Sequence, residues 1–175
     1  KVRNTTLGDA KKEGLLPSVT TIISSLAKPG LERWKQEQVL LASLTLPRLE
    51  NEPEEDWLKR VIEDSRSTGK DAMDRGTQIH NILEAYFNQT YMPEYPSYTY
   101  RTEQALREHF GDQFWITEKS FAHPSGYAGK CDLLSTEGIV VDFKTKESLK
   151  NTQVYLEHEM QISAYCNGLG MPYAR

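Results

Sequence analysis

The sequence GIVVDFKTKES, residues 138 to 148, gives the strongest indication of the fold. It begins as a buried strand should, with three β-branched apolar residues at positions 139 to 141. Asp142 and Lys144 follow two positions apart, so an acid and a base point to the same side of the strand as Val140. The opposite face is expected to pack into the core through Ile139, Val141 and Phe143. A strand that belongs inside a sheet therefore carries charged groups that need a compensating partner.

The strand is predicted to be half of a hairpin that carries two opposed carboxylates. GYAGKCDLL and GIVVDFK flank STEG, a turn with glycine at its end. If the hairpin is centred on Glu137, Asp132 lies opposite Asp142, at a separation of about 5 Å. This register is inferred from the turn alone, and a slip of one residue would separate the two acids.

Opposed carboxylates favour a divalent cation, because like charges across a sheet destabilise it. Magnesium commonly takes one or two protein carboxylates, keeps waters and completes its shell with substrate phosphate. Such an ion activates water and neutralises charge on a phosphoryl group, and a lysine beside it can orient the water or bind the phosphate. Two acids and a lysine on one hairpin face therefore indicate a phosphodiesterase site. The alternative is a solvated Asp-x-Lys ion pair worth under about 1 kcal/mol.

Composition bounds the class of protein. The chain has 175 residues, enough for one globular domain, and contains no apolar run that would cross a bilayer. A net charge of −4 argues against a general nucleic-acid coat, but a local basic patch could still bind phosphates. Two cysteines are too few for an iron–sulfur cluster and are compatible with a reducing compartment.

The order of elements predicts an α/β fold, a small mixed β-sheet flanked by helices, with a helical N-terminal part. We expect a single domain over residues 1–175, with a helical wall at about 17–111 and a catalytic sheet and further helix at about 113–170. The chain is expected to continue beyond its last residue. Helices are predicted from Ser18 to Pro29, then at about 31–43, 57–69, 75–87, 103–110 and 152–168, with strands from Gln113 onward and a solvated acidic loop at 49–56.

Four motifs in this order resemble the nuclease core of the PD-(D/E)XK superfamily. They are RGTxxH (75–80), GxxD (129–132), VDFKT (141–145) and QxxxY (161–165). The first is similar to the histidine-bearing helix of the RecB-like branch. LPSVTTII (16–23) is similar to the mitochondrial genome maintenance exonuclease family and related phage and bacterial nucleases. The resemblance covers most of the chain between Pro17 and Tyr165, and it implies a restriction-endonuclease-like core.

The resemblance implies a role for each matching residue. Asp132 and Asp142 would hold the metal with the main-chain carbonyl of Phe143, and His80 would join or adjoin the metal shell. Lys144 would be the catalytic lysine and Gln161 would line the site. Tyr165 would touch the nucleic-acid backbone. Independently of the resemblance, Arg75, Lys130 and Lys146 are candidate phosphate contacts by their charge, with ordinary surface residues as the alternative. Glu118 is equally compatible with an additional acid of the site and with an exposed strand glutamate, and His109, His123 and His158 are expected to be surface residues.

The implied activity is Mg²⁺- or Mn²⁺-dependent hydrolysis of DNA, as an exonuclease in replication, recombination or repair. The expected partner is DNA, single-stranded or as duplex ends, and we expect no membrane partner and no iron–sulfur cluster. A homo-oligomer or a larger repair complex fits the family. The expected location is the cytoplasm, for a bacterial or phage protein, or the mitochondrial matrix if a transit peptide is missing. Two alternatives stay open: a non-cleaving nucleic-acid-binding module of the same fold, and a metal-dependent hydrolase of another phosphate ester.

Overall fold

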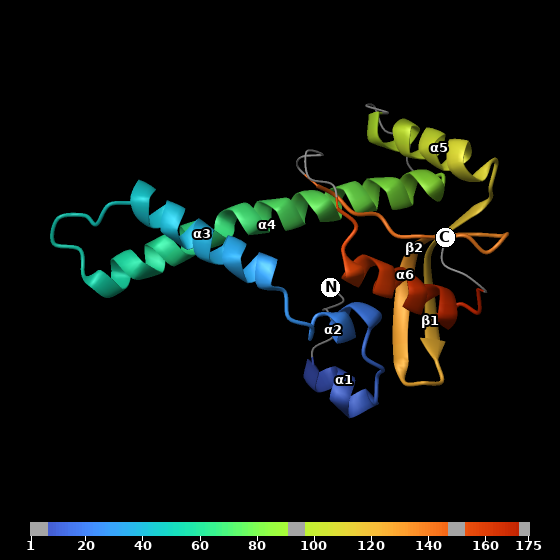
Figure 1. The fold of residues 1–175 in the computed structure, drawn as a ribbon, viewed down its shortest axis with the longest axis horizontal. Coiled ribbons are helices and arrows are strands. Elements are labelled where there is room, and N and C mark those ends of the chain that lie inside the picture. The colour runs from blue at the N-terminus through green and yellow to red at the C-terminus, as the bar shows by residue number, and fades with distance from the viewer. Residues whose placement is uncertain (1–6, 91–96, 147–152, 172–175) are drawn as a thin grey trace. The chain divides into compact units, whose positions relative to one another are not determined.

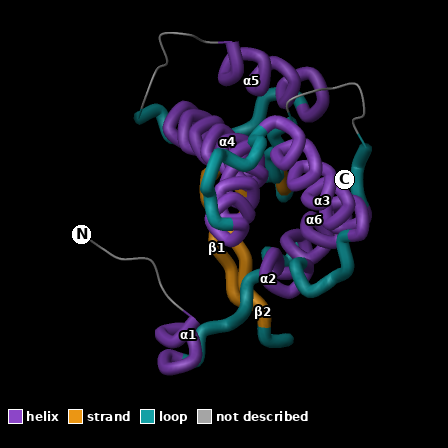
Figure 2. The backbone as a smooth tube through the Cα atoms, turned by 90° about the vertical axis from the view of Figure 1, so that its left-hand side faces the viewer, coloured by secondary structure: helices purple, strands orange, loops and turns teal. Residues whose placement is uncertain are grey.

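The computed structural model describes residues 7–90, 97–146 and 153–171 (Figures 1 and 2). The described residues form two compact units. The first combines the residues up to Leu26 with those from His80 onward and contains the sheet; the second, residues 27–79, is helical. Helix α4 (Glu54–Phe87) contributes to both units.

The sheet of the first unit has the register that the turn predicted. Strands β1 (Trp115–His123), β2 (Tyr127–Ser135) and β3 (Val140–Val141) pair in the order β1-β2-β3, all antiparallel. Leu133 lies opposite Val141, and Leu134 lies opposite Val140. This register brings position 132 opposite position 142, as expected. The prediction of a mixed sheet is wrong for these strands, because parallel pairing among the described residues is confined to an isolated bridge between Ser18 and Ala128.

The β2–β3 turn fixes this register through a serine and a glycine. The Ser135 N–H donates to the carbonyl of Ile139 at 2.8 Å, which closes a loop of three residues centred on Glu137. The Ser135 hydroxyl accepts the N–H groups of Glu137 at 3.2 Å and Ile139 at 3.1 Å. Gly138 has a φ of +88°, the left-handed conformation that ends a three-residue hairpin loop and suits glycine.

Two helices cover the hairpin and form the core of the first unit. Helix α6 (Leu156–Gly168) crosses the β1–β2 ribbon, and α2 (Val19–Ile23) lies beside it against β2 (Figures 1 and 2). Helix α2 begins as predicted, because the Ser18 side chain accepts the N–H of Thr21 at 3.1 Å. The buried cluster between these elements comprises Val19, Ile23, Cys131, Leu134, Val140, Tyr165 and Cys166.

The side of β3 that carries Asp142 is the more deeply buried one. Val140 is buried in the cluster with α6, whereas the residues expected to pack into the core, Ile139, Val141 and Phe143, are only partly buried. That expectation is therefore wrong as stated. Asp142 thus lies beside α6, where Gln161 reaches it, and its burial increases the energetic cost of its charge.

Three predicted helix boundaries differ from those of the structure. Helix α2 ends at Ile23, and Pro29, predicted as a stop, begins α3 (Pro29–Thr45), where its fixed φ suits a first helical turn. The two helices predicted at 57–69 and 75–87 are one continuous helix, α4. Gly69 does not break it, and its α-carbon faces the ring of Trp34 on α3, 3.5 Å from where a Cβ would lie.

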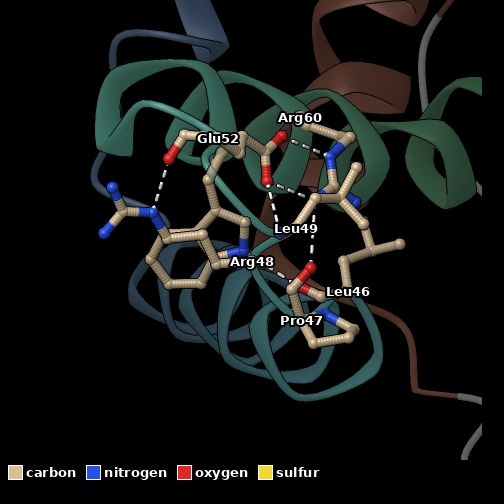
Figure 3. Close-up of polar contacts among 7 residues, drawn as sticks. Leu46, Pro47, Arg48, Leu49, Glu52 and Arg60 are labelled. Carbon is tan, nitrogen blue, oxygen red and sulfur yellow. Dashed lines mark hydrogen bonds and ion pairs between the residues drawn. The ribbon is translucent and has the colours of Figure 1, made fainter.

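The acidic loop between α3 and α4 is built around Glu52 and is not simply solvated (Figure 3). Arg60 binds the Glu52 carboxylate through Nη2 at 2.8 Å and the carbonyl of Pro47 at 3.0 Å. The N–H of Leu49 donates to the same carboxylate at 2.9 Å. The hydrogen bond from Arg60 is the main cause that lowers the pKa of Glu52. The acidic composition of this segment predicts an exposed loop, but composition does not reveal which donors will bind Glu52 in the folded chain.

Two further helices complete the described part of the chain. The short helix α1 (Leu7–Glu13) precedes α2, and α5 (Ser97–Phe110) is longer than the predicted helix at 103–110. Tyr86 at the end of α4 donates a hydrogen bond to Glu103 on α5, and the rings of Phe110 and Trp115 meet edge to face at 6.4 Å. Within the described ranges, no helix combines the length and the apolar character that crossing a membrane requires.

Candidate active site

The two predicted acids lie at the end of the β2–β3 hairpin, each held by a different donor. Asp132 accepts the backbone N–H of Phe143 at 2.6 Å, which ties β2 to the chain leaving β3. Asp142 follows β3 directly and receives two side-chain donors. Lys144 pairs with its Oδ2, and the amide of Gln161 donates to its Oδ1 at 3.0 Å. The sequence predicts all four of these side chains as site residues, whereas for Phe143 it predicts a role of the main-chain carbonyl and not of the N–H that bonds Asp132.

The surroundings of Asp142 oppose its negative charge. Its side chain is only 8% exposed, and burial raises its pKa above the ordinary value. Lys144 opposes this rise by hydrogen bonding and charge, whereas the neighbouring charge of Asp132 adds to it. Burial together with a like charge is the arrangement expected where a carboxylate is kept for chemistry or for a cation.

Gln161 and Tyr165 support the site from α6. The Gln161 amide bonds both Asp142 and the hydroxyl of Tyr165, the latter at 2.8 Å. Tyr165 is only 4% exposed and belongs to the core cluster, where its ring meets Phe121 edge to face. The structure therefore gives Tyr165 a supporting position in place of the nucleic-acid contact predicted for it. Spacing of four places both side chains on one face of α6 but does not reveal how deep that face lies.

His80 joins the site from α4. Its Nδ1 lies 3.3 Å from Oδ1 of Asp132, and its ring meets Phe143 edge to face at 6.1 Å. About a third of the His80 side chain is exposed. Helix α4 thus places the imidazole of His80 beside Asp132, whereas Lys144 bonds the other acid, Asp142. The predicted position of His80 next to the acids agrees with this geometry.

Glu118 lies across the β1–β2 ladder from Asp132 in an unusual backbone conformation. The register Thr117–Leu133 and Lys119–Cys131 leaves Glu118 and Asp132 opposite each other. Glu118 has a φ of +52°, which costs a non-glycine residue about 1–3 kcal/mol and is concentrated at functional sites. Its carboxylate pairs with Lys130 on β2. This pairing fits an acid at the margin of the site and leaves the role of Lys130 in nucleic-acid binding a prediction.

The two remaining residues predicted to contact nucleic acid, Lys146 and Arg75, lie in different parts of the structure. Lys146 donates to the carbonyl of Gln153 at 3.0 Å, and its ammonium group lies 5.0 Å from the centre of the Tyr155 ring. Arg75 lies on the part of α4 that belongs to the helical unit, and its contact with nucleic acid stays a prediction.

His158 is the residue of this region that sequence reasoning missed. It was expected at the surface, but it is partly buried on α6, with its ring 5.4 Å from that of Tyr155. Burial and the nearby charge of Lys144 lower its pKa. The signal was available in the sequence, because His158 lies three residues before Gln161 and seven before Tyr165, on the same helical face.

The donor set fits a hard divalent cation. Two partly buried carboxylates from opposed positions match the oxygen ligands that Mg²⁺ and Mn²⁺ take together with water. The imidazole of His80 is not a preferred ligand of Mg²⁺, and in this structure it contacts Asp132. Among the described residues, no three side chains of His, Cys, Asp or Glu converge closely enough to hold a metal by themselves. Water, main-chain carbonyl and substrate oxygens would therefore complete the shell.

Comparison of this chain with known proteins identified no similar protein. No protein-family model matches this chain, and no curated protein or solved structure matches it either.

Proposed function

We propose that this protein is a Mg²⁺- or Mn²⁺-dependent nuclease that hydrolyses phosphodiester bonds of DNA, as an exonuclease in replication, recombination or repair. The observation that supports it most directly is the β2–β3 register, whose continuation puts Asp132 opposite Asp142, with Lys144 and Gln161 both bonded to Asp142. Two neighbouring carboxylates in a partly buried position support this proposal, because burial and the charge of Asp132 both oppose the ionisation of Asp142.

Each residue has a distinct task in this proposal. A bound divalent ion would supply an activated water and neutralise charge that develops on the phosphoryl oxygens. Asp132 and Asp142 would hold that ion, and His80 would orient Asp132 through the 3.3 Å contact. Lys144, exposed enough to reach a substrate, would turn from Asp142 to the phosphate or the attacking water. Gln161 would keep Asp142 in place during this exchange.

A second candidate function is a nucleic-acid-binding module of the same fold that does not cleave. The observation in its favour is that each acid already accepts hydrogen bonds from this chain. In addition, the described part contains no group of three His, Cys, Asp or Glu side chains placed to hold a metal ion. The nuclease proposal is preferred because these hydrogen bonds also explain how the acids are positioned in the absence of a cation.

The test is cleavage of end-labelled DNA, single-stranded and duplex, with Mg²⁺ or Mn²⁺. We expect Asp142→Asn and Lys144→Ala to lower the rate by at least about 10²-fold, the scale of one general acid–base or electrostatic group. The matched controls are Asp56→Asn and Lys59→Ala, which remove an exposed ion pair of 3.3 Å on α4 and should leave the rate unchanged.

Unchanged cleavage by both site variants would refute the assignment of the site. Absence of cleavage by the wild type, with DNA binding retained, would instead select the non-cleaving module.

A further inference from the structure

A cavity of about 620 Å³ lies between α5 and Phe143, the residue that separates Asp142 from Lys144. Its other wall is one continuous face of α5, formed by positions at spacings of three and four that include Tyr98, Arg101, Ala105 and His109. The volume falls within the range of small-ligand sites. All of these residues belong to the first unit, so the cavity is part of the same body as the site.

The lining combines an unpaired cation with flat aromatic rings. Arg101 is exposed, and its guanidinium has no ion-pair or hydrogen-bond partner among the described residues. Arg107 on the same helix differs, since it pairs with Asp112 at 2.7 Å. Tyr98 is 61% exposed at the cavity, where Phe110 and Phe143 also present rings. An unpaired guanidinium suits a phosphate, and an exposed ring suits a base that has left its stack.

Phe143 links this cavity to the acids. Its N–H holds Asp132 at 2.6 Å, and its ring contacts His80 on one side while lining the cavity. A strand whose phosphate lies at the acids would therefore pass its neighbouring nucleotide along the Phe143 ring toward α5. Within a duplex that nucleotide would not offer its base to Tyr98, because stacking on the neighbouring base pairs covers both faces of the base.

We propose that the cavity between α5 and Phe143 is a binding site for an unpaired nucleotide adjoining the scissile phosphate, with Arg101 on the phosphate and Tyr98 on the base. This inference rests on the proposed function for the position of the strand. It adds a recognition site that the motifs do not contain, on a helix that supplies none of the residues assigned to the acids.

The test measures binding of two fluorescein-labelled probes by anisotropy. Ca²⁺ replaces Mg²⁺ so that the probes bind without being cleaved. One probe is a dT 12-mer, and the other is an abasic strand of the same length. Arg101→Ala should weaken binding of both probes about 10-fold and reduce the slope of log K against log salt by about 0.7, the value for one phosphate contact on a single strand. Tyr98→Ala should weaken the dT probe about 5- to 10-fold and leave the abasic probe unchanged.

Arg107→Ala is the matched control, the same substitution on the same helix outside this cavity, and should alter neither probe. Equal losses for Arg101→Ala and Arg107→Ala would overturn the site, as would equal losses of both probes in Tyr98→Ala. The two proposals can fail independently. Suppose that the wild type cleaves DNA, that Lys144→Ala abolishes cleavage, and that Arg101→Ala binds both probes like the wild type. The nucleotide site is then refuted, while the nuclease proposal stands. If the wild type does not cleave but the two cavity variants weaken binding as expected, the site stands and the nuclease fails.

Discussion

Asp142 shows how a single residue can oppose the stability of the fold that positions it. Burial is the largest cause that raises its pKa, and the charge of Asp132 acts in the same direction. The folded protein therefore binds this proton more tightly than the unfolded chain does. As the pH rises from the unfolded value, near 3.8, through the higher folded pKa, Asp142 reduces the free energy of unfolding.

We therefore expect Asp142→Asn to be at least as stable as the wild type at pH 7, although it should lose activity. The advantage of the variant should shrink as the pH falls toward 3.8, because the wild-type carboxyl is then neutral as well. Urea unfolding of both proteins between pH 4 and pH 7 measures this difference. A wild type that gains stability over the variant as the pH rises would show that Lys144 and Gln161 outweigh burial.

At the scale of the elements, α6 is packed so closely on the β1–β2 ribbon that two positions admit only glycine. A Cβ added at Gly129 on β2 would lie 2.6 Å from the ring of Phe121 and 2.9 Å from that of Tyr165. At Gly168, the last residue of α6, it would lie 2.0 Å from the Phe121 ring. This close approach places the helix where Gln161 can reach Asp142.

Gly168→Ala should lower the free energy of unfolding by about 1–3 kcal/mol, because Phe121 cannot move away without disturbing Tyr165. The matched control is Gly30→Ala in α3, where a Cβ would have no neighbour within 4 Å. This control should be neutral or more stable by about 0.4–1 kcal/mol. Urea unfolding distinguishes the two, and equal stability of Gly168→Ala and the wild type would contradict the packing described here.

At the scale of the whole molecule, both thiols report on the integrity of the first unit. Cys131 and Cys166 belong to one buried cluster, and Cys131 is 0% exposed. Burial raises the pKa of Cys131 to about 11 and also raises that of Cys166. Since the thiolate is the reactive form, neither group should react readily while the core is closed.

We expect alkylation of the native protein at pH 8 to be slower than that of the urea-unfolded chain by at least about 10²-fold. Labelling with iodoacetamide across a urea gradient measures it, and a Cys166→Ser variant isolates the signal of Cys131. Rapid labelling of Cys131 without denaturant would show that the sheet opens locally beneath α6.

Much of the hairpin could be predicted because its information is local. The turn of Glu137 and Gly138 sets the register, alternation places Asp142 and Lys144 on one side, and Ser18 marks the start of α2. Spacing likewise placed Gln161 on a helix face with Tyr165. These relations span few residues, so they depend on backbone geometry that the sequence itself specifies.

Other properties were decided by tertiary contacts. The length of α4, the burial of Tyr165 and of the Asp142 side of β3, and the donors around Glu52 all depend on partners that are distant in sequence. Glycine in a helix costs only about 1 kcal/mol, which neighbouring packing can offset, so Gly69 could not show whether the helix continues. Local sequence is enough to predict which residues face one another across the hairpin. Which of them are removed from water depends on the elements that pack over them, because burial is a property of everything that surrounds a residue.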